Sequence, residues 1–134
     1  PLEGATDFVR WLRERYQVVI LSDTFYQFAQ PLMRQLGFPT LFCNQLEIDG
    51  TGRIVRYHMR MQNQKKHSVA AFKSLNFFTM AAGDAYNDTA MLGEADVGFF
   101  FRPPEHLPKE FPQFPVTQSY GELQERFAKS GNFT

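Results

Sequence analysis

The chain has 134 residues, 43% of them hydrophobic, which is enough for one domain with a core of its own. Its 14 lysines and arginines balance 14 aspartates and glutamates, so the net charge gives no support for a nucleic-acid partner. No apolar run approaches the roughly 18 residues of a membrane span, no signal peptide is recognisable, and the single cysteine, Cys43, agrees with a reducing compartment, so we predict a cytoplasmic protein without a membrane partner.

The first predicted element is a helix of about ten residues that ends near Arg15. Thr6 or Asp7 is its candidate N-cap, because a side-chain oxygen there satisfies a backbone N–H that has no helical partner. The chain begins with Pro1 rather than methionine and runs almost directly into this helix. We therefore expect the sequence to be a piece of a longer protein.

A buried strand and an amphipathic helix come next. The strand covers residues 17–21, since this apolar run lacks the alternation of a half-exposed strand, and the polar residues 22–24 end it. Apolar residues at helical spacing then predict a helix over residues 25–36, stopped by Gly37. Pro31 lies inside this helix and predicts a kink or two short helices.

Two strand-like runs around a glycine turn predict a β-hairpin. A short strand at 40–43 precedes them, the runs cover residues 46–49 and 54–61, and we place the hairpin insertion at about 45–62. The second run has two alternating faces, and the predicted buried one consists of Val55, Tyr57, Met59 and Met61.

The rest of the chain alternates helices and strands. The predicted elements are a helix at 65–75, a strand at 77–82, a helix at 88–95, a strand at 97–101, a proline-rich surface loop at 102–115 and a final helix that Ser119 caps and that runs to about Lys129. Val69, Phe72 and Leu75 form the predicted inward face of the first of these helices. Such alternation indicates a parallel α/β sheet covered by helices on both faces.

An acidic stretch, Gly83-Asp84-Ala85-Tyr86-Asn87-Asp88, follows one of the apolar runs directly and precedes a helical pattern. Parallel sheets bind ligands at the carboxyl ends of their strands, so two carboxylates there mark a candidate site. Mg²⁺ suits such a site, because it prefers one or two carboxylates together with waters and substrate phosphate. The alternative is an ordinary loop of turn-forming residues in which Asp88 caps the next helix.

Other polar residues along the chain add to this signal. Ser22 directly follows the first buried strand, where a hydroxyl and backbone N–H groups are able to bind a phosphate oxygen, although an ordinary loop serine is the alternative. Lys65 or Lys66 begins a helix, where a cation is unfavourable against the helix dipole, although a solvated lysine is the commoner case. Asn87 is able to donate to an oxyanion. Each signal alone is weak, but their order along the chain is rare.

This order, with the residues at each step, resembles the haloacid dehalogenase (HAD) superfamily of phosphohydrolases nearly from end to end. The segments that resemble its phosphoserine phosphatase branch are Gly4-Ala5, the Ser22 turn, Cys43-Asn44-Gln45-Leu46, the Lys65 helix and Gly83 to Asp88. Within that branch, similarity to the bacterial bifunctional phosphoserine phosphatase/homoserine phosphotransferases appears in residues 18–25, 30–40 and 110–115, the first of which departs from the usual serine-glycine-glycine-phenylalanine.

The resemblance implies where the phosphoryl group binds. Ser22 binds it, with Asp23 and Thr24 as the other members of the phosphate-binding turn. Asn87 hydrogen-bonds near the phosphate. In phosphoryl transfer, positioning and charge stabilisation of this kind do most of the catalysis.

The resemblance also implies which residues manage charge. Lys65, in preference to Lys66, neutralises charge on the nucleophile and the phosphate, so that the implied catalytic residues are Lys65, Ser22 and Asn87. Asp84 ligates Mg²⁺, and Asp88 supports the metal site directly or through a water.

The fold that the resemblance implies is a Rossmann-like three-layer α/β sandwich with a mostly parallel sheet and a small β-hairpin. Residues 1–134 would form the C-terminal part of one such core domain. The family's nucleophilic aspartate lies on the first strand, in an aspartate-x-(aspartate or glutamate)-glycine motif that a helical cap follows. No such motif precedes Ser22 in this sequence.

The family's strand order, five, four, one, two, three, places that first strand between strands 17–21 and 77–82. We therefore expect these two strands to flank an empty slot without pairing, and Ser22 and Asp84 to share a pocket at its mouth. We also expect the chain alone to be unstable, because buried unpaired strand edges are costly, and to lack phosphatase activity.

The function that the resemblance implies is Mg²⁺-dependent hydrolysis or transfer of the phosphoryl group of a small phosphorylated amino acid. The implied substrate is phosphoserine, the implied acceptor for transfer is homoserine, and the implied role is in serine biosynthesis as part of a longer enzyme. The alternative is a non-catalytic phosphate- or metal-binding α/β module, and a third interpretation is a signalling-type α/β domain with an acidic pocket. The cap that selects the substrate is outside this sequence, so the substrate, the choice between hydrolysis and transfer, and the oligomeric state stay open.

Overall fold

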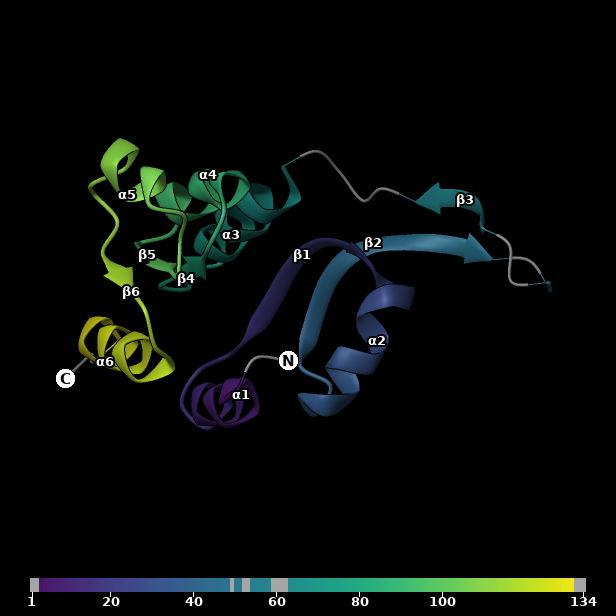
Figure 1. Cartoon of the computed structure of the whole chain (residues 1–134), viewed down its shortest axis with the longest axis horizontal. Helices are drawn as coiled ribbons and strands as arrows, with labels where there is room; N and C mark the ends of the chain where they lie inside the picture. The colour runs from purple at the N-terminus through teal and green to yellow at the C-terminus, as the bar shows by residue number, and fades with distance from the viewer. Residues whose placement is uncertain (1–2, 49, 52–53, 59–62, 132–134) are drawn as a thin grey trace. The chain divides into compact units, whose positions relative to one another are not determined.

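The computed structural model describes residues 3–48, 50–51, 54–58 and 63–131, with the backbone alone at 45–48 and 54–58. Strands and helices alternate in it, which confirms the predicted α/β class, and the chain divides into two compact units, Pro1–Gln64 and Lys65–Thr134 (Figure 1). Each unit contains one three-stranded sheet. That the chain is part of a single domain stays a prediction. No helix in the described part of the chain has the length and apolar character that crossing a membrane requires.

The first unit is built on two parallel strands. Its elements are α1 (Ala5–Arg13), β1 (Val19–Phe25), α2 (Tyr26–Gln35), β2 (Thr40–Ile48) and β3 (Ile54–His58). β1 and β2 run side by side in parallel register from Val19 opposite Thr40 to Leu21 opposite Phe42 (Figure 1). Pairing resumes at Phe25 after a register shift, so the polar residues 22–24 do not end the strand as predicted but form an irregular segment within it.

The connections in this unit correct two further predictions. α2 is one uninterrupted helix through Pro31, so the prediction of two short helices is wrong; a proline removes only one backbone hydrogen bond of the helix. Gly37 follows the helix with a φ of 79°, as its predicted role in ending the helix requires. The short strand at 40–43 and the first hairpin run are a single strand, β2, which pairs with β3 in the predicted antiparallel hairpin. The predicted buried face of the second run lies outside the described side chains.

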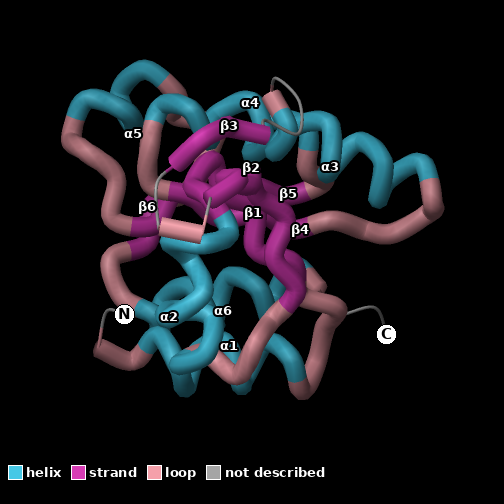
Figure 2. Tube along the Cα trace, turned by 90° about the vertical axis from the view of Figure 1, so that its right-hand side faces the viewer, coloured by secondary structure: helices cyan, strands magenta, loops and turns pink. Residues whose placement is uncertain are grey.

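The second unit is arranged around β5, which pairs in parallel with β4 on one side and with β6 on the other (Figure 2, strands in magenta). Its elements are α3 (Gln64–Ser74, which begins at the last residue of the first unit), β4 (Met80–Gly83), the 3₁₀ turn η1 (Tyr86–Asp88), α4 (Thr89–Glu94), β5 (Val97–Phe101), α5 (His106–Glu110), β6 (Val116–Thr117) and α6 (Tyr120–Ser130). The Oγ of Ser119 accepts a hydrogen bond from the Glu122 N–H at 3.1 Å, which confirms it as the cap of the last helix.

The core of the second unit lies on both faces of β5. Phe99 and Phe100 are buried on opposite faces of this strand, and their rings pack edge-to-face against Phe127 and Phe114. Gly98 lets α4 approach the strand, because a Cβ at that position would lie 2.6 Å from the Leu92 carbonyl oxygen. A central strand buried on both faces explains why residues 97–101 read as one apolar run.

The segment between the end of α3 and the start of β4 differs from the prediction. β4 begins at Met80 rather than at residue 77, and Phe77 and Phe78 are exposed. Leu75, predicted to face inward, is 66% exposed, whereas Val69 is buried as predicted. α3 ends at Ser74, so Leu75 lies beyond the helix and no longer follows its inward face.

β1 and β4 are the end strands of their sheets. Each pairs with one neighbour only among the described strands. That the two strands flank an empty slot without pairing stays a prediction. That Ser22 and Asp84 share a pocket stays a prediction.

Thr79 and Asp96, the residues just before β4 and β5, are joined by hydrogen bonds. One oxygen of the Asp96 carboxylate accepts from the Thr79 N–H at 2.7 Å and from the Thr79 hydroxyl at 3.0 Å, while the Asp96 N–H donates back to that hydroxyl at 3.0 Å. The backbone N–H of Thr79 lowers the pKa of Asp96 because it stabilises the charged carboxylate; desolvation opposes this effect, and the Thr79 hydroxyl and Lys73 add to it.

We predict that the stability supplied by Asp96 depends on pH. A carboxylate whose pKa is lower in the folded state stabilises the fold above its unfolded pKa of about 3.9, and this contribution is lost as pH falls through the folded pKa. Asp96→Asn should therefore lower the urea unfolding midpoint of the full-length gene product at pH 7, and the difference from the unmodified protein should shrink below about pH 4. Asp7→Asn, at an exposed surface pair with Arg10, is the control. A deficit that stays the same from pH 7 to pH 3 would contradict the prediction.

Candidate active site

The residues predicted from the sequence fall into two groups, one in each unit. β1 carries Ser22, Asp23 and Thr24. α3 and the loop after β4 carry Lys65, Asp84, Asn87 and Asp88.

The Ser22 side chain makes a hydrogen bond within its own segment. The Oγ of Ser22 accepts a hydrogen bond from the Thr24 N–H at 3.1 Å, a turn in which a serine side chain replaces a strand partner. This turn accounts for the register shift that interrupts β1. Asp23, between the two, is exposed.

Two buried carboxamides hold this segment, and sequence reasoning assigned a role to neither. Asn44 is 2% exposed, and its Nδ2 donates to the Asp23 carbonyl oxygen at 2.9 Å. Gln64 is 1% exposed, and its Nε2 donates to the Ser22 carbonyl oxygen and to Asp23 Oδ1, the latter at 3.2 Å. The only sequence signal was the position of Asn44 in a segment that resembles the family; Gln64 gave none.

The acidic loop is organised by Asp88, which is 5% exposed. Its Oδ2 accepts from the N–H groups of Asp84 at 3.0 Å and Ala85 at 3.1 Å. Its Oδ1 pairs with the Lys65 ammonium at 2.6 Å, where the lysine side chain is 15% exposed. The alternative in which the Asp88 side chain caps the next helix is wrong, because that helix has no side-chain cap hydrogen bond.

Gly83 makes room for this carboxylate. A Cβ at residue 83 would lie 2.6 Å from Asp88 Cβ and 2.7 Å from its Oδ2. Those distances are well below van der Waals contact, so the strand must end in glycine for Asp88 to reach the loop N–H groups.

The two lysines considered from the sequence have different surroundings. Lys65 is paired with Asp88, whereas Lys66 is exposed. This difference favours Lys65 as the functional residue. The roles of Lys65, Ser22 and Asn87 in catalysis stay predictions.

The donor set of the loop fits Mg²⁺ through Asp84. This carboxylate is exposed at the carboxyl end of β4, while both oxygens of Asp88 are engaged by the loop and by Lys65. Among the described residues, no group of three or more histidine, cysteine, aspartate or glutamate side chains is placed to hold a metal ion. Mg²⁺ needs no such group, because one or two carboxylates with waters and phosphate suffice. That Asp84 would be the direct ligand stays a prediction, while Asp88 holds the loop that carries Asp84.

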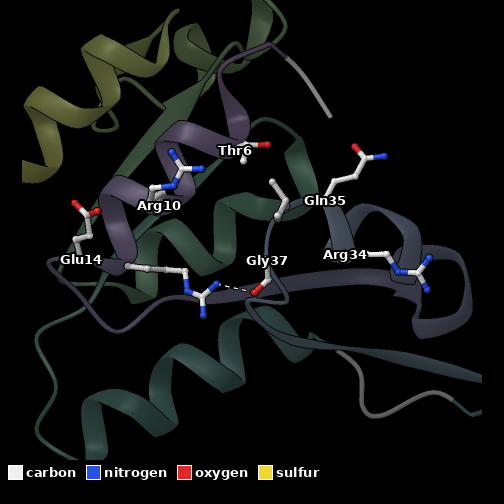
Figure 3. A pocket seen from close by; sticks show the side chains of 8 residues that line it. Thr6, Arg10, Glu14, Arg34, Gln35 and Gly37 are labelled. Carbon is white, nitrogen blue, oxygen red and sulfur yellow. Dashed lines mark hydrogen bonds between the residues drawn. The ribbon is translucent and has the colours of Figure 1, made fainter.

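A cavity of about 370 Å³ in the first unit lies elsewhere (Figure 3). Its lining is Thr6, Arg10, Arg13, Glu14, Arg34, Gln35, Leu36 and Gly37, which includes none of the predicted site residues. Arg13 donates to the Gly37 carbonyl oxygen at 2.9 Å, so it satisfies the end of α2. Arg10 and Arg34 do not point toward one another, so their guanidinium groups do not converge on an anion.

Comparison with known proteins decides the family. The model of the haloacid dehalogenase-like hydrolases matches residues 1–93, which is more than half of the chain. The chain belongs to the HAD-like hydrolases. The segments from which the resemblance was recognised, up to the acidic loop, lie within the matched residues.

Two curated relatives of this chain are both named phosphoserine phosphatase. The phosphoserine phosphatase of Pseudomonas syringae pv. tomato is 60% identical over 132 residues, which are 98% of this chain and 56% of that protein. The phosphoserine phosphatase ThrH of Pseudomonas aeruginosa is 59% identical over 132 residues, 98% of this chain and 64% of that protein. The chain is thus similar to these phosphoserine phosphatases over nearly its whole length, and it spans less than two thirds of their own length.

Solved structures of phosphoserine phosphatases share the fold. A substrate-bound complex matches with a TM-score of 0.76 and 23% identity over 94% of this chain and 63% of that one. A phospho-aspartyl intermediate analogue matches with a TM-score of 0.74 and 21% identity over 94% of this chain and 64% of that one.

We predict that Gly83→Ala disrupts the acidic loop. The added methyl group must displace Asp88, which breaks its bonds to the loop N–H groups and to Lys65, and overpacking of this kind costs about 1–3 kcal/mol. Urea unfolding of the full-length gene product should show this loss, and hydrogen exchange of the Asp84 and Ala85 amides should accelerate.

The matched control is Gly93→Ala in α4, where the nearest atom to the new Cβ is Phe114 Cζ at 3.9 Å. This variant should be as stable as the unmodified protein or more so, since alanine is favoured over glycine in a helix. Equal stability of the two variants would rule out steric exclusion at residue 83.

Proposed function

We propose that this HAD-like hydrolase is a Mg²⁺-dependent phosphatase of a small phosphorylated amino acid, phosphoserine, and that it acts as part of a longer protein. The observation that carries the proposal is the acidic loop, in which buried Asp88 fixes Lys65 and leaves Asp84 exposed at the end of a parallel strand. The names of the relatives at 59% and 60% identity support the substrate.

The chemistry follows from where charge is placed. Bound Mg²⁺ supplies positive charge that offsets the charge of the phosphoryl oxygens. Asp84 holds the ion, and Asn87 donates a hydrogen bond near the phosphate. The Lys65 ammonium, held in one position by Asp88, adds a second positive charge that needs no rearrangement during the reaction.

The Ser22 turn binds the phosphoryl group in this proposal. Its hydroxyl is a donor for a phosphate oxygen, and the Thr24 N–H donates to the oxygen of that hydroxyl. The nucleophile lies outside these residues, because no aspartate-x-(aspartate or glutamate)-glycine motif precedes Ser22. The longer protein would supply it.

The test compares two proteins. We expect the full-length gene product to release phosphate from phosphoserine with Mg²⁺ and to stop doing so when the metal is chelated. The 134-residue chain alone should release none above a metal-free control. A full-length protein that binds phosphate or Mg²⁺ but hydrolyses nothing would establish the alternative, a non-catalytic binding module.

Transfer to homoserine is the finer part of the proposal, and it rests on the similarity of residues 18–25, 30–40 and 110–115 to the bifunctional enzymes. Adding homoserine to the same assay should yield phosphohomoserine at the expense of free phosphate. Unchanged phosphate release without that product would limit the function to hydrolysis.

A prediction for Asp84 tests the metal assignment. Asp84→Asn keeps the shape of the side chain and removes its charge, and the loss of one electrostatic contact of about 3 kcal/mol lowers the rate by about 10²-fold. We expect a fall of about this size or more in the full-length enzyme, with a higher Mg²⁺ requirement. Asp23→Asn is the matched comparison and should be much milder. Near-normal activity of Asp84→Asn at unchanged Mg²⁺ dependence would exclude Asp84 as the ligand.

A further inference from the structure

We propose that Gln64 is a positioning residue of this hydrolase: its buried carboxamide fixes the Ser22–Asp23 segment in the conformation that presents the segment to a phosphoryl group. The inference rests on the proposed function, since it concerns the same phosphate-binding turn. It goes beyond that function because neither the sequence pattern nor the resemblance assigned Gln64 a role.

The contacts of Gln64 come from far along the chain. Its Nε2 donates to the carbonyl oxygen of Ser22 and to the carboxylate of Asp23, which lie 42 and 41 residues away in the sequence. At 1% exposure, a polar side chain without hydrogen bonds would destabilise the fold, so these contacts decide whether glutamine is tolerated there.

Gln64 acts together with Asn44 on successive peptide groups. Gln64 holds the carbonyl of Ser22, and Asn44 holds the carbonyl of Asp23 at 2.9 Å. A trans peptide is planar, so its N–H points opposite to its C=O. Each carboxamide therefore directs the N–H of the peptide group that it holds away from itself, the Asp23 N–H away from Gln64 and the Thr24 N–H away from Asn44.

The Ser22 side chain accepts a hydrogen bond from one of these N–H groups. The Thr24 N–H donates to Ser22 Oγ at 3.1 Å, so the hydroxyl oxygen lies on the side opposite to the Asp23 carbonyl. Fixing the two peptide planes thus fixes the hydroxyl as well. Donors that are held before a ligand arrives bind it with less loss of entropy, which is the advantage a phosphate-binding turn gains.

Gln64 also positions the side-chain carboxylate of Asp23. A negative charge next to a phosphate-binding serine repels the ligand, and its effect depends on where it points. Donation from Gln64 Nε2 to Asp23 Oδ1 at 3.2 Å holds this carboxylate toward the buried amide. The neutral amide thereby controls both the backbone and the one carboxylate of the turn.

The test uses Gln64→Glu, which keeps the size of the side chain but replaces its N–H donors with oxygen acceptors. At pH 8 we expect kcat/KM of the full-length enzyme for phosphoserine to fall about 10²-fold, because three oxygens then face one another. A carboxyl group buried among oxygens has a pKa raised above about 4.3, and its protonated form donates one hydrogen bond. The ratio of variant to unmodified kcat/KM should therefore recover at least severalfold at pH 6.

Two further variants separate positioning from folding. Gln35→Glu changes an exposed glutamine of α2 and should leave the pH profile unchanged. Gln64→His retains a ring N–H donor and should keep kcat/KM within about threefold of the unmodified enzyme. Thermal unfolding shows which variants are folded. A folded Gln64→Glu with normal kcat/KM at pH 8, or one whose loss is the same at pH 6 and pH 8, would overturn the proposal. A folded Gln64→His as inactive as Gln64→Glu would overturn it as well.

Binding of inorganic phosphate, measured by calorimetry, separates this proposal from the proposed function. If the unmodified protein fails to hydrolyse phosphoserine, the proposed function fails. The positioning role then stands if phosphate binds the unmodified protein at least tenfold more tightly than Gln64→Glu. It fails if the two bind phosphate equally or if neither binds it.

Discussion

The second unit depends on one buried carboxylate. An ionised aspartate at 5% exposure is tolerated only if its oxygens are paired, and Asp88 meets this condition with two loop N–H groups and the Lys65 ammonium. Each neighbour is constrained in turn. Residue 83 must lack a Cβ, the chain from Asp84 to Ala85 must turn its N–H groups inward, and the Asp84 side chain is left facing out. The exposure of Asp84, the proposed metal ligand, is thus a consequence of the buried pair.

In the first unit, buried side-chain amides rather than charged groups hold the proposed site residues in place. Asn44 and Gln64 hold the backbone of the Ser22 segment through carbonyl oxygens, so that an exposed aspartate and a half-buried serine are held in a fixed irregular segment of β1. A neutral amide suits this position, because a buried cation would need a charged partner of its own. In both units, therefore, the residues proposed to touch phosphate or metal are held by buried polar residues that the proposed mechanism does not use directly.

Whether a feature was predictable from the sequence depends on how far apart along the chain its interacting residues lie. β5 was found with its bounds, and α2 and the Ser119 cap were found because apolar spacing and caps are local signals. β6 was missed, since its two residues are a strand only by pairing with β5. The order of Ser22, Lys65 and Asp84 was recognisable along the chain. The roles of Gln64 and Asn44 were not, because hydrogen bonds across 21 to 42 residues leave no periodicity.

The end strands of the two sheets bear on the proposal that this chain acts as part of a longer protein. β1 and β4 each pair on one side only among the described strands; β1 carries proposed site residues in its irregular segment, and β4 is followed by others just beyond its carboxyl end. A strand edge presents unpaired N–H and C=O groups, which are costly when buried and promote association when exposed. The relatives are longer than the part that this chain matches, and the aspartate motif of the family does not precede Ser22 here. Under the proposed function, a further strand that carries such an aspartate would pair with one of these edges and also supply the nucleophile, so stability and activity would depend on the same strand.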